Sequence, residues 1–396
     1  MPLNWSREEA RLYQLAAVGL HGRSYPDGEE GIRLAFRDLR AVQLDPLPIL
    51  GRNHDLVFQS RVEGTHPGVF LDLLHRERLG FEYWDKMLCA IPIAEFPLFR
   101  ALMAGGGNPW EKQREERLDR DHPGAKDAVL QEVRRNGPLS TAELRKLSVA
   151  QGEHRGWKTT QAAGAALEVL WNQGQLSVSH RVNYRRYFDL TERVVPRQIL
   201  AQATPSGEEF LRQLLRKRVD TVGLLPAGGA AETWMFLRQA RTEGLPQRMV
   251  ENGDLALVRV EGVRTPFYAR PDAQKVLRAA ERVPADDRAR MIAPLDPLLW
   301  CRDALAKVWG FTYAWEVYKK PEGRQYGYYV LPILHRGRFV ARFDGRFDAK
   351  ANVLHVLGYW KEPDGFPLKH AAIQDAFGRF LDYLGGKKIA WSPRLR

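Results

Sequence analysis

The sequence contains few residues that bind metals or form disulfides. Only two of its 396 residues are cysteines, Cys89 and Cys301, and neither belongs to a Cys-x-x-Cys pair or to the cysteine and histidine spacing of a zinc finger. A disulfide framework, a structural zinc site and an iron–sulfur cluster therefore lack a ligand set. We expect no metal and no other cofactor, and we interpret both cysteines as small buried side chains.

Long apolar runs are also missing. A membrane-spanning helix needs about eighteen consecutive apolar residues, and the sequence contains no such stretch. The first residues, MPLNWSREEARLYQ, are polar and charged where a signal peptide has an apolar core. These features predict a cytoplasmic, nucleoid-associated protein without a membrane partner.

The sequence has fewer acidic than basic residues. The chain has 48 Asp and Glu against 60 Lys and Arg, which gives a formal net charge of +12. Such a protein attracts polyanions, of which nucleic acid is the first candidate in a cytoplasm. Ribosome-associated proteins and RNA enzymes share this basicity, so charge alone does not identify the partner. With 44% hydrophobic and 27% charged residues the chain is typical of folded proteins, and its length suggests two to four domains.

The middle of the chain predicts three helices followed by a β-hairpin. The segment AVLQEVRRNGPLSTAELRKL predicts a helix, a turn at residues 136–138, and a second helix on which Ser140 and Glu143 form a capping box. GWKTTQAAGAALEVLWNQG predicts a third helix that ends at Gly174, and QLSVSHRVNYRRYFDL predicts two strands with a turn near Val182. This order is typical of a winged helix, a variant of the helix-turn-helix that binds DNA.

Basic residues cluster in this segment. Between His154 and Phe188 the sequence has five basic residues and a single acidic one, Glu168. The basic residues lie at the start of the predicted recognition helix and on the predicted wing, where a winged helix contacts DNA phosphates. The alternative is a solvated face on a winged helix that binds proteins. The candidate DNA contacts of this segment are Trp157, Lys158, Arg181, Arg185 and Arg186.

Two flanking segments predict similar orders of elements, and the end of the chain differs. In residues 6–100 an amphipathic helix precedes EEGIRLAFRDLRAV, whose apolar residues Ile32, Ala35, Phe36 and Leu39 follow helical spacing. Residues 206–270 predict helices followed by two strands. After residue 294, YGYYVLPILHRGRFVARFDGRFD predicts two strands joined by a turn at residues 335–338, as part of a β-rich closing region.

The segment AVQLDPLPILGRNHDLVFQSRV, residues 41–62, carries the candidate chemistry. Gln43 and Asp45 place an amide and a carboxylate two positions apart, which suits holding and activating a water molecule. Asp45 precedes Pro46, so a helix N-cap is an alternative interpretation. A second Asp-Pro-Leu sequence, in APLDPLLW, is interpreted as such an N-cap at Asp296.

Four segments together resemble a known family: LRAVQLDPLPILGRNHDLVFQSR, FEYWDKMLCAIP, APLDPLLWCRDALAKVWGFTYAWEVY and RQYGYYVLPILHRGRFVARFD. They are similar to the winged-helix DNA glycosylases that unhook interstrand crosslinks, the YcaQ-like family. The resemblance implies an α+β fold of three tandem winged-helix domains and a β-rich C-terminal domain, with expected ranges 1–110, 111–200, 201–290 and 291–396. It also implies that Gln43 and Asp45 form the catalytic Gln-x-Asp motif, on the first winged helix.

The chemistry follows from the substrate that the resemblance implies, double-stranded DNA with an alkylated or crosslinked guanine. Alkylation at N7 makes guanine a good leaving group, so a carboxylate at Asp45 needs only to stabilise the sugar cation and deprotonate water. Gln43 would position the water or the sugar. No Schiff-base lysine is needed, so we expect a monofunctional, monomeric glycosylase that leaves an abasic site. Candidate contacts near the lesion, each with an alternative as an ordinary surface or cap residue, are Arg52, Asn53, His54 and Arg61.

The sequence departs from the family pattern at two positions. Lys86 stands where the family has a histidine after EYW, and Cys301 stands where its C-terminal motif has an aspartate. Lys86 is a further candidate DNA contact, with a surface lysine as the alternative. Two other functions stay open: a winged-helix transcription regulator that dimerises on a palindromic site, and a lesion-binding protein without activity.

Overall fold

The computed structural model describes residues 1–106, 109–150 and 160–395 and divides the chain into two compact units. Unit 1 combines Met1–Phe70, Asp85–Cys89 and Leu214–Arg396, and unit 2 combines Leu71–Trp84 with Ala90–Gln213. Unit 1 thus takes up parts of the first, third and fourth predicted domains, whose boundaries stay a prediction. None of the described helices is long and apolar enough to cross a membrane.

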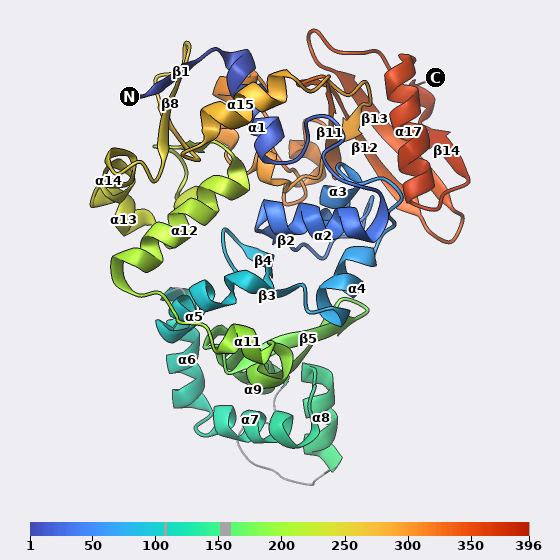
Figure 1. Ribbon diagram of the computed structural model, residues 1–396. Helices are drawn as coiled ribbons and strands as arrows, with labels where there is room; N and C mark the ends of the chain where they lie inside the picture. Colours follow the sequence, from blue (N-terminus) through green and yellow to red (C-terminus); the bar gives the residue numbers. More distant parts are fainter. Residues whose placement is uncertain (107–108, 151–159, 396) are drawn as a thin grey trace. The chain divides into compact units, whose positions relative to one another are not determined.

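The described residues form both helices and strands, with five helices in succession from α5 to α9 (Figure 1). The longer helices are α1 (Arg7–Ala17), α2 (Gly28–Leu39), α3 (Asn53–Gln59), α4 (Val69–Arg76), α5 (Phe96–Ala104), α6 (Pro109–Asp121), α7 (Ala125–Asn136), α8 (Thr141–Ala150), α9 (Thr160–Asn172), α12 (Gly207–Val222), α13 (Arg238–Thr242), α14 (Leu245–Glu251), α15 (Ala273–Glu281), α16 (Arg302–Trp309) and α17 (Ala371–Tyr383). Two short helices, α10 (Thr191–Val194) and α11 (Arg197–Leu200), follow the hairpin of unit 2.

The strands gather in separate groups. They are β1 (Leu3–Trp5), β2 (Val42–Gln43), β3 (Gly80–Trp84), β4 (Leu88–Pro92), β5 (Leu176–Val182), β6 (Arg185–Leu190), β7 (Leu225–Pro226), β8 (Ala256–Val260), β9 (Phe267–Ala269), β10 (Arg290–Met291), β11 (Val330–His335), β12 (Arg338–Asp348), β13 (Val353–Lys361) and β14 (Lys388–Trp391). This mixture confirms the predicted α+β class.

The first helices of unit 1 form for reasons visible in their sequence. Ser6 and Glu9 make a capping box at the start of α1, because each backbone N–H bonds to the other residue's side chain. In α2 the predicted apolar stripe is buried, and it includes Phe36, whose ring lies 5.0 Å from that of Phe70. Phe58 of α3 packs on Phe70 at 4.4 Å, so α2, α3 and the start of α4 share one aromatic core.

Two sheets complete unit 1. In the sheet β1-β8-β9-β7, the hairpin β8–β9 is extended by β1, which pairs in parallel with β8. The five-stranded sheet runs in the order β10-β11-β12-β13-β14, and its β11–β12 hairpin has its turn where the sequence predicts it. Helix α17 lies against this sheet in Figure 1, and the ring of Phe377 contacts that of Phe343 at 4.9 Å.

Unit 2 contains the predicted order of three helices and a hairpin, as α7, α8, α9, β5 and β6. The Glu143 carboxylate accepts the backbone N–H of Ser140 at 3.0 Å, which is one of the two bonds of the predicted capping box. The Ser140 hydroxyl donates to the same carboxylate at 3.1 Å. Gly174 follows α9 with a φ of +73°, a conformation that favours glycine. The element order is therefore confirmed, and the assignment of this unit as a DNA-binding winged helix stays a prediction.

Candidate active site around Gln43 and Asp45

The Gln43 and Asp45 side chains lie at the end of a short strand in unit 1. Gln43 closes β2, and the next residue, Leu44, donates its backbone N–H to the carbonyl oxygen of Leu88 at 2.9 Å. This bond continues the extended conformation beyond β2, which favours the same side for positions two apart. Both side chains are almost covered, because Gln43 and Asp45 are each 8% exposed.

Asp45 has a local hydrogen bond but caps no α-helix. Its Oδ1 accepts the backbone N–H of Leu47 at 2.9 Å, an Asx-type turn around Pro46, and the next helix starts only at Asn53. Burial raises the pKa of Asp45 above its ordinary value, while the Leu47 N–H acts in the opposite direction. The result is a partly desolvated carboxylate that is a stronger base than a surface aspartate.

The Gln43 side chain carries an unused acceptor. Its Oε1 is buried and has no hydrogen-bond partner within the described residues. Such an orphaned acceptor costs about 1–3 kcal/mol, so it is rare in a protein interior unless water or a ligand supplies the missing donor. A water molecule bound beside Gln43 would donate an O–H to this oxygen and satisfy it.

Asn53 fixes the backbone of the motif. Its Nδ2 donates to the carbonyl oxygen of Gln43 at 2.8 Å, and its Oδ1 accepts the backbone N–H of Leu295 at 2.9 Å. Asn53 itself is completely buried. It therefore holds the strand of the motif against the segment that precedes Asp296, and it does not face a DNA backbone.

Arg61 is also internal. Its guanidinium pairs with both carboxylate oxygens of Asp296, at 2.7 and 2.9 Å, and neither side chain is exposed. Asp296 caps the following turn by accepting the N–H of Leu298, which confirms its predicted N-cap role. The expectation that Arg61 contacts DNA is not supported by this placement, and we do not retain it for the proposed interface.

His54 and Arg52 differ in exposure. His54 is completely buried beside Asp55, with its Nε2 3.8 Å from a carboxylate oxygen, so it too is not retained as a DNA contact. Arg52 is half-buried at the N-cap position of α3 and remains a candidate. Burial raises the pKa of the neighbouring Asp55 to about 6, and no pattern in the sequence singles out this carboxyl as a buried titratable group.

Lys86 follows a buried ionic cluster in unit 1. Asp85 accepts hydrogen bonds from Lys217 and Arg218, and all three side chains are almost completely buried. The half-buried Lys86 places its ammonium over the ring of Trp300, 5.5 Å from the centroid. Burial lowers the pKa of this ammonium.

The basic residues of unit 2 have different surroundings. Arg181 pairs with both oxygens of the buried Glu82, and this partner together with His75 holds the pKa of the carboxyl at about 2 against the effect of burial. Arg186 pairs with Glu168. Arg185 is exposed and makes no ion pair within the described residues. The other two candidates, Trp157 and Lys158, lie outside the described residues.

Both cysteines are buried, as expected. Burial raises the pKa of Cys89 to about 12 and that of Cys301 to about 11, so both thiols stay protonated at neutral pH. Among the described residues, no group of three or more histidine, cysteine or acidic side chains could hold a metal ion.

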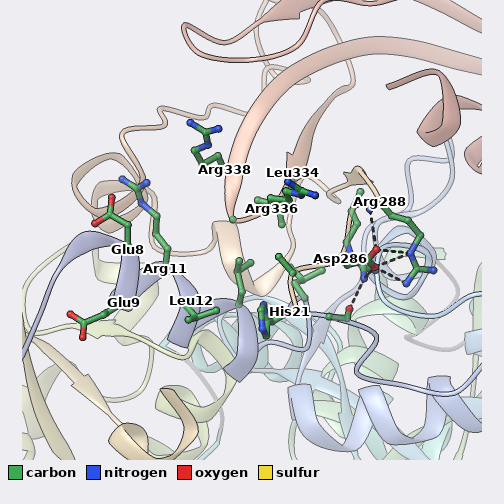
Figure 2. Close-up of a pocket in the computed structure, with 16 residues that line it drawn as sticks. Glu8, Glu9, Arg11, Leu12, His21, Asp286, Arg288, Leu334, Arg336 and Arg338 are labelled. Carbon is green, nitrogen blue, oxygen red and sulfur yellow. Dashed lines mark hydrogen bonds and ion pairs between the residues drawn. The ribbon is translucent and has the colours of Figure 1, made fainter. Parts of the chain in front are cut away.

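A separate cavity of about 510 Å³ lies in unit 1 between α1, residues 285–290 and the β11–β12 turn (Figure 2). Its lining does not include the Gln-x-Asp motif. Carboxylates neutralise most of its guanidinium groups, because Asp286 pairs with Arg288 and Arg290 and Asp287 pairs with Arg336. We assign this cavity no part in the chemistry.

Two comparisons with known proteins agree. A family model described as "DNA glycosylase AlkZ-like" matches residues 36–383 of this chain. The solved structure of the DNA glycosylase AlkZ from Streptomyces sahachiroi matches over 98% of this chain and 100% of its own, with a TM-score of 0.64 and 18% sequence identity. At this identity the structural likeness shows a common fold.

Proposed function

The chain belongs to the AlkZ-like DNA glycosylase family and is a DNA N-glycosylase, and we propose that it releases N7-alkylated guanine through Gln43 and Asp45. One observation carries the assignment of these residues. A desolvated carboxylate stands two positions from a buried glutamine whose Oε1 lacks a partner within the described residues. Carboxylates and amides in this state are typical of sites that bind and activate water.

Asp45 is proposed to act on both the sugar and the water. An N7-alkylated guanine leaves as a neutral base, so the transition state requires mainly a negative charge beside the developing sugar cation. The carboxylate supplies this charge and can accept a proton from the attacking water. Its raised pKa strengthens it as a base without a metal or a second acid.

Gln43 is proposed to position the water. Its buried Oε1 can accept one hydrogen of a water molecule whose other hydrogen faces Asp45. The Asn53 bond to the Gln43 carbonyl restricts how far the strand can move. A small displacement of a catalytic group lowers the rate strongly, so this bond is expected to matter for turnover.

The proposed substrates include interstrand crosslinks. A crosslinked guanine is tethered to the opposite strand and cannot be rotated into a closed pocket, so its glycosylase needs an accessible site and strong contacts to phosphates. The net charge of +12 supports such contacts, and the partly exposed Arg52 and exposed Arg185 are the candidates that we retain.

The test uses a labelled duplex with one N7-alkylguanine and a second duplex with one nitrogen-mustard crosslink. Each is incubated with the protein and treated with alkali, which cuts the strand at abasic sites. Wild type is expected to yield cleavage and Asp45→Asn to lose it by at least about a hundredfold. Asp375→Asn, a change in an exposed ion pair of α17, is the matched control.

The same assay separates the alternatives. Cleavage of the monoadduct but not of the crosslink would restrict the substrate class. Tight binding without cleavage by any variant would contradict the proposed reaction and favour a lesion-binding protein or a regulator. A regulator would in addition prefer a palindromic site and bind it as a dimer.

A further inference from the structure

We propose a second activity, in which the Lys86 amine attacks the abasic site left by base release and cleaves the DNA strand through a Schiff base. The proposal rests on the proposed function only because that reaction supplies the abasic site. It concerns a residue at which this chain departs from the pattern of the family it resembles, where a histidine is expected. It also changes the expectation of a monofunctional enzyme.

The first support is the fixed position of Lys86. Its neighbour Asp85 is anchored by Lys217 and Arg218, and the backbone N–H of Asp85 bonds to the carbonyl oxygen of Met87 at 2.9 Å. These bonds hold the chain on both sides of Lys86. Because Lys217 and Arg218 already pair with the Asp85 carboxylate, Asp85 does not form an ion pair with the Lys86 ammonium.

The second support is that the Lys86 amine is not engaged in an ion pair within the described residues. Its described neighbour is the ring of Trp300, which faces the ammonium at 5.5 Å. An aromatic face can accommodate either a cation or a neutral amine. Lysine nucleophiles in enzymes are commonly desolvated in this way, beside apolar surface and other cations.

The third support is the path from Lys86 to the motif. The backbone N–H of Leu44, between Gln43 and Asp45, donates to the carbonyl oxygen of Leu88. Lys86 lies two positions before Leu88, in a bend, so their Cα atoms are at most about 7 Å apart. Lysine has a flexible four-carbon stem that can cover this kind of distance.

A chain of hydrogen bonds also connects Trp300, the ring beside the Lys86 ammonium, to Gln43. The indole N–H of Trp300 donates to the carbonyl oxygen of Leu295, and the N–H of Leu295 donates to Asn53. Asn53 in turn donates to the carbonyl oxygen of Gln43. Lys86 therefore contacts the same internal framework that fixes the motif.

Electrostatics favour a neutral amine. Burial lowers the pKa of Lys86 most, and the positive charges of Arg302 and Arg218 act in the same direction. Cys301 and Cys89 act in the opposite direction, but burial raises the pKa of both thiols, so they stay protonated at neutral pH. A larger fraction of neutral amine is therefore present than for a surface lysine.

The neutral Lys86 amine adds to the C1′ aldehyde of the ring-opened abasic sugar, and loss of one water with uptake of one proton from solvent gives a protonated imine. Transfer of a proton from C2′ to solvent water then expels the 3′ phosphate as a leaving group, with formation of a C2′–C3′ double bond. Water hydrolyses the imine, which regenerates the amine and releases an unsaturated aldehyde on the cut strand. No oxidant, reductant or metal is consumed.

The experiment traps the imine with borohydride on a duplex that already contains an abasic site. The site is produced beforehand by excision of a uracil, so the result does not depend on release of alkylated guanine by this protein. Wild type is expected to give a covalent protein–DNA adduct and a nicked strand without alkali. Mass spectrometry of the digested adduct is expected to place the DNA on the peptide that contains Lys86.

Three variants make the test specific. Lys86→Met and Lys86→Arg are expected to lower the trapped fraction by more than about tenfold, because neither side chain can form a Schiff base. Lys86→Arg keeps the positive charge, and thermal unfolding and DNA binding report whether its fold is intact. Lys350→Met removes an exposed lysine as the matched control and is expected to trap like wild type.

The outcomes are distinct from those for the proposed function. No adduct from wild type, or an undiminished adduct from Lys86→Arg, would overturn the lyase proposal whatever happens to alkylated DNA. Trapping at Lys86 without any release of alkylated guanine would support the lyase and contradict the glycosylase substrate proposed above.

Discussion

The side-chain amide of Asn53 donates a hydrogen bond of 2.8 Å to the backbone oxygen of Gln43, and its Oδ1 accepts the N–H of Leu295, so Asn53 links two Asp-Pro-Leu segments of the chain. The first segment carries Asp45, and the second, which contains Asp296, begins just after Leu295, the other partner of Asn53. The two segments resemble each other in sequence but differ in role. One presents candidate catalytic groups, and the other supports them from inside the protein.

Asn53→Asp tests this positioning. An aspartate can still accept the N–H of Leu295, but it has no donor for the Gln43 carbonyl and places a negative charge in a buried site. We expect kcat for base release to fall about 10- to 100-fold, with a smaller change in KM. Steady-state kinetics on an N7-alkylguanine duplex, with substrate in excess over the protein, measure both.

Two readouts separate a positioning role from simple unfolding. Thermal unfolding reports the loss of stability, and Asn53→Gln, which keeps both a donor and an acceptor, is expected to recover part of kcat. A variant that folds normally and turns over like wild type would exclude a positioning role for Asn53.

The buried pair of Arg61 and Asp296 predicts a large effect on stability. Arg61→Met leaves the carboxylate without its partner in the protein interior, and we expect a loss of about 3–5 kcal/mol in the free energy of unfolding. In Arg61→Met with Asp296→Asn, the uncompensated charge is gone, so the double variant should be more stable than Arg61→Met alone. Urea denaturation measures all three proteins. A loss below about 1 kcal/mol for Arg61→Met would contradict the buried placement.

Asp55 predicts a dependence of stability on pH. Its pKa is raised from 3.8 to about 6 in the folded protein, chiefly by burial, whereas Gly68 and Arg52 act in the opposite direction. A carboxyl with a raised pKa contributes its full stability below pH 3.8 and loses it as the pH rises through 6. Above pH 6 the buried charge therefore costs up to about 3 kcal/mol.

Asp55→Asn removes this cost and keeps an oxygen for the Gly68 N–H. The variant should exceed wild type in stability at pH 8, and the difference should shrink toward pH 4.5. Chemical denaturation at several pH values measures the difference, with the exposed Asp375→Asn as the control for surface charge. The expectation fails if the Asp55→Asn difference does not change with pH.

Short-range features of this structure could be predicted from the sequence. The buried stripe of α2, the bond from the Ser140 N–H to Glu143, the N-cap at Asp296 and the turn between β11 and β12 depend on residues a few positions apart. Their geometry follows from helix and strand periodicity and from local hydrogen bonds. The spacing of Gln43 and Asp45 places both side chains on one side only if the segment is extended, and the structure supplies that extension.

The burial and the hydrogen-bond partners of the polar residues that follow the Gln-x-Asp motif could not be predicted from neighbouring sequence. Asn53 and Arg61 are common surface types, but their partners, Leu295 and Asp296, lie more than 230 positions away in the sequence. Nothing within a local window indicates such a pairing. Arg181 illustrates the same limit in unit 2, because its partner Glu82 is 99 positions away.

Two arginines of the β5–β6 hairpin differ in exposure and in ion pairing. Arg185 is exposed without an ion pair in the described part of the chain, whereas Arg181 pairs with the buried Glu82 and is almost covered. If the hairpin β5–β6 meets DNA phosphates, Arg185→Ala should weaken binding to damaged and undamaged duplexes alike. It should also reduce the slope of log K against log salt by about 0.9, the contribution of one phosphate contact. Arg181→Ala should instead lower the free energy of unfolding by about 3–5 kcal/mol, because it removes the guanidinium that pairs with both oxygens of the buried Glu82. Fluorescence anisotropy between low and moderate salt, together with urea denaturation, distinguishes these effects. An unchanged salt slope for Arg185→Ala would mean that the hairpin does not contact the DNA backbone at this residue, and Arg52 in unit 1 would then be the remaining candidate contact.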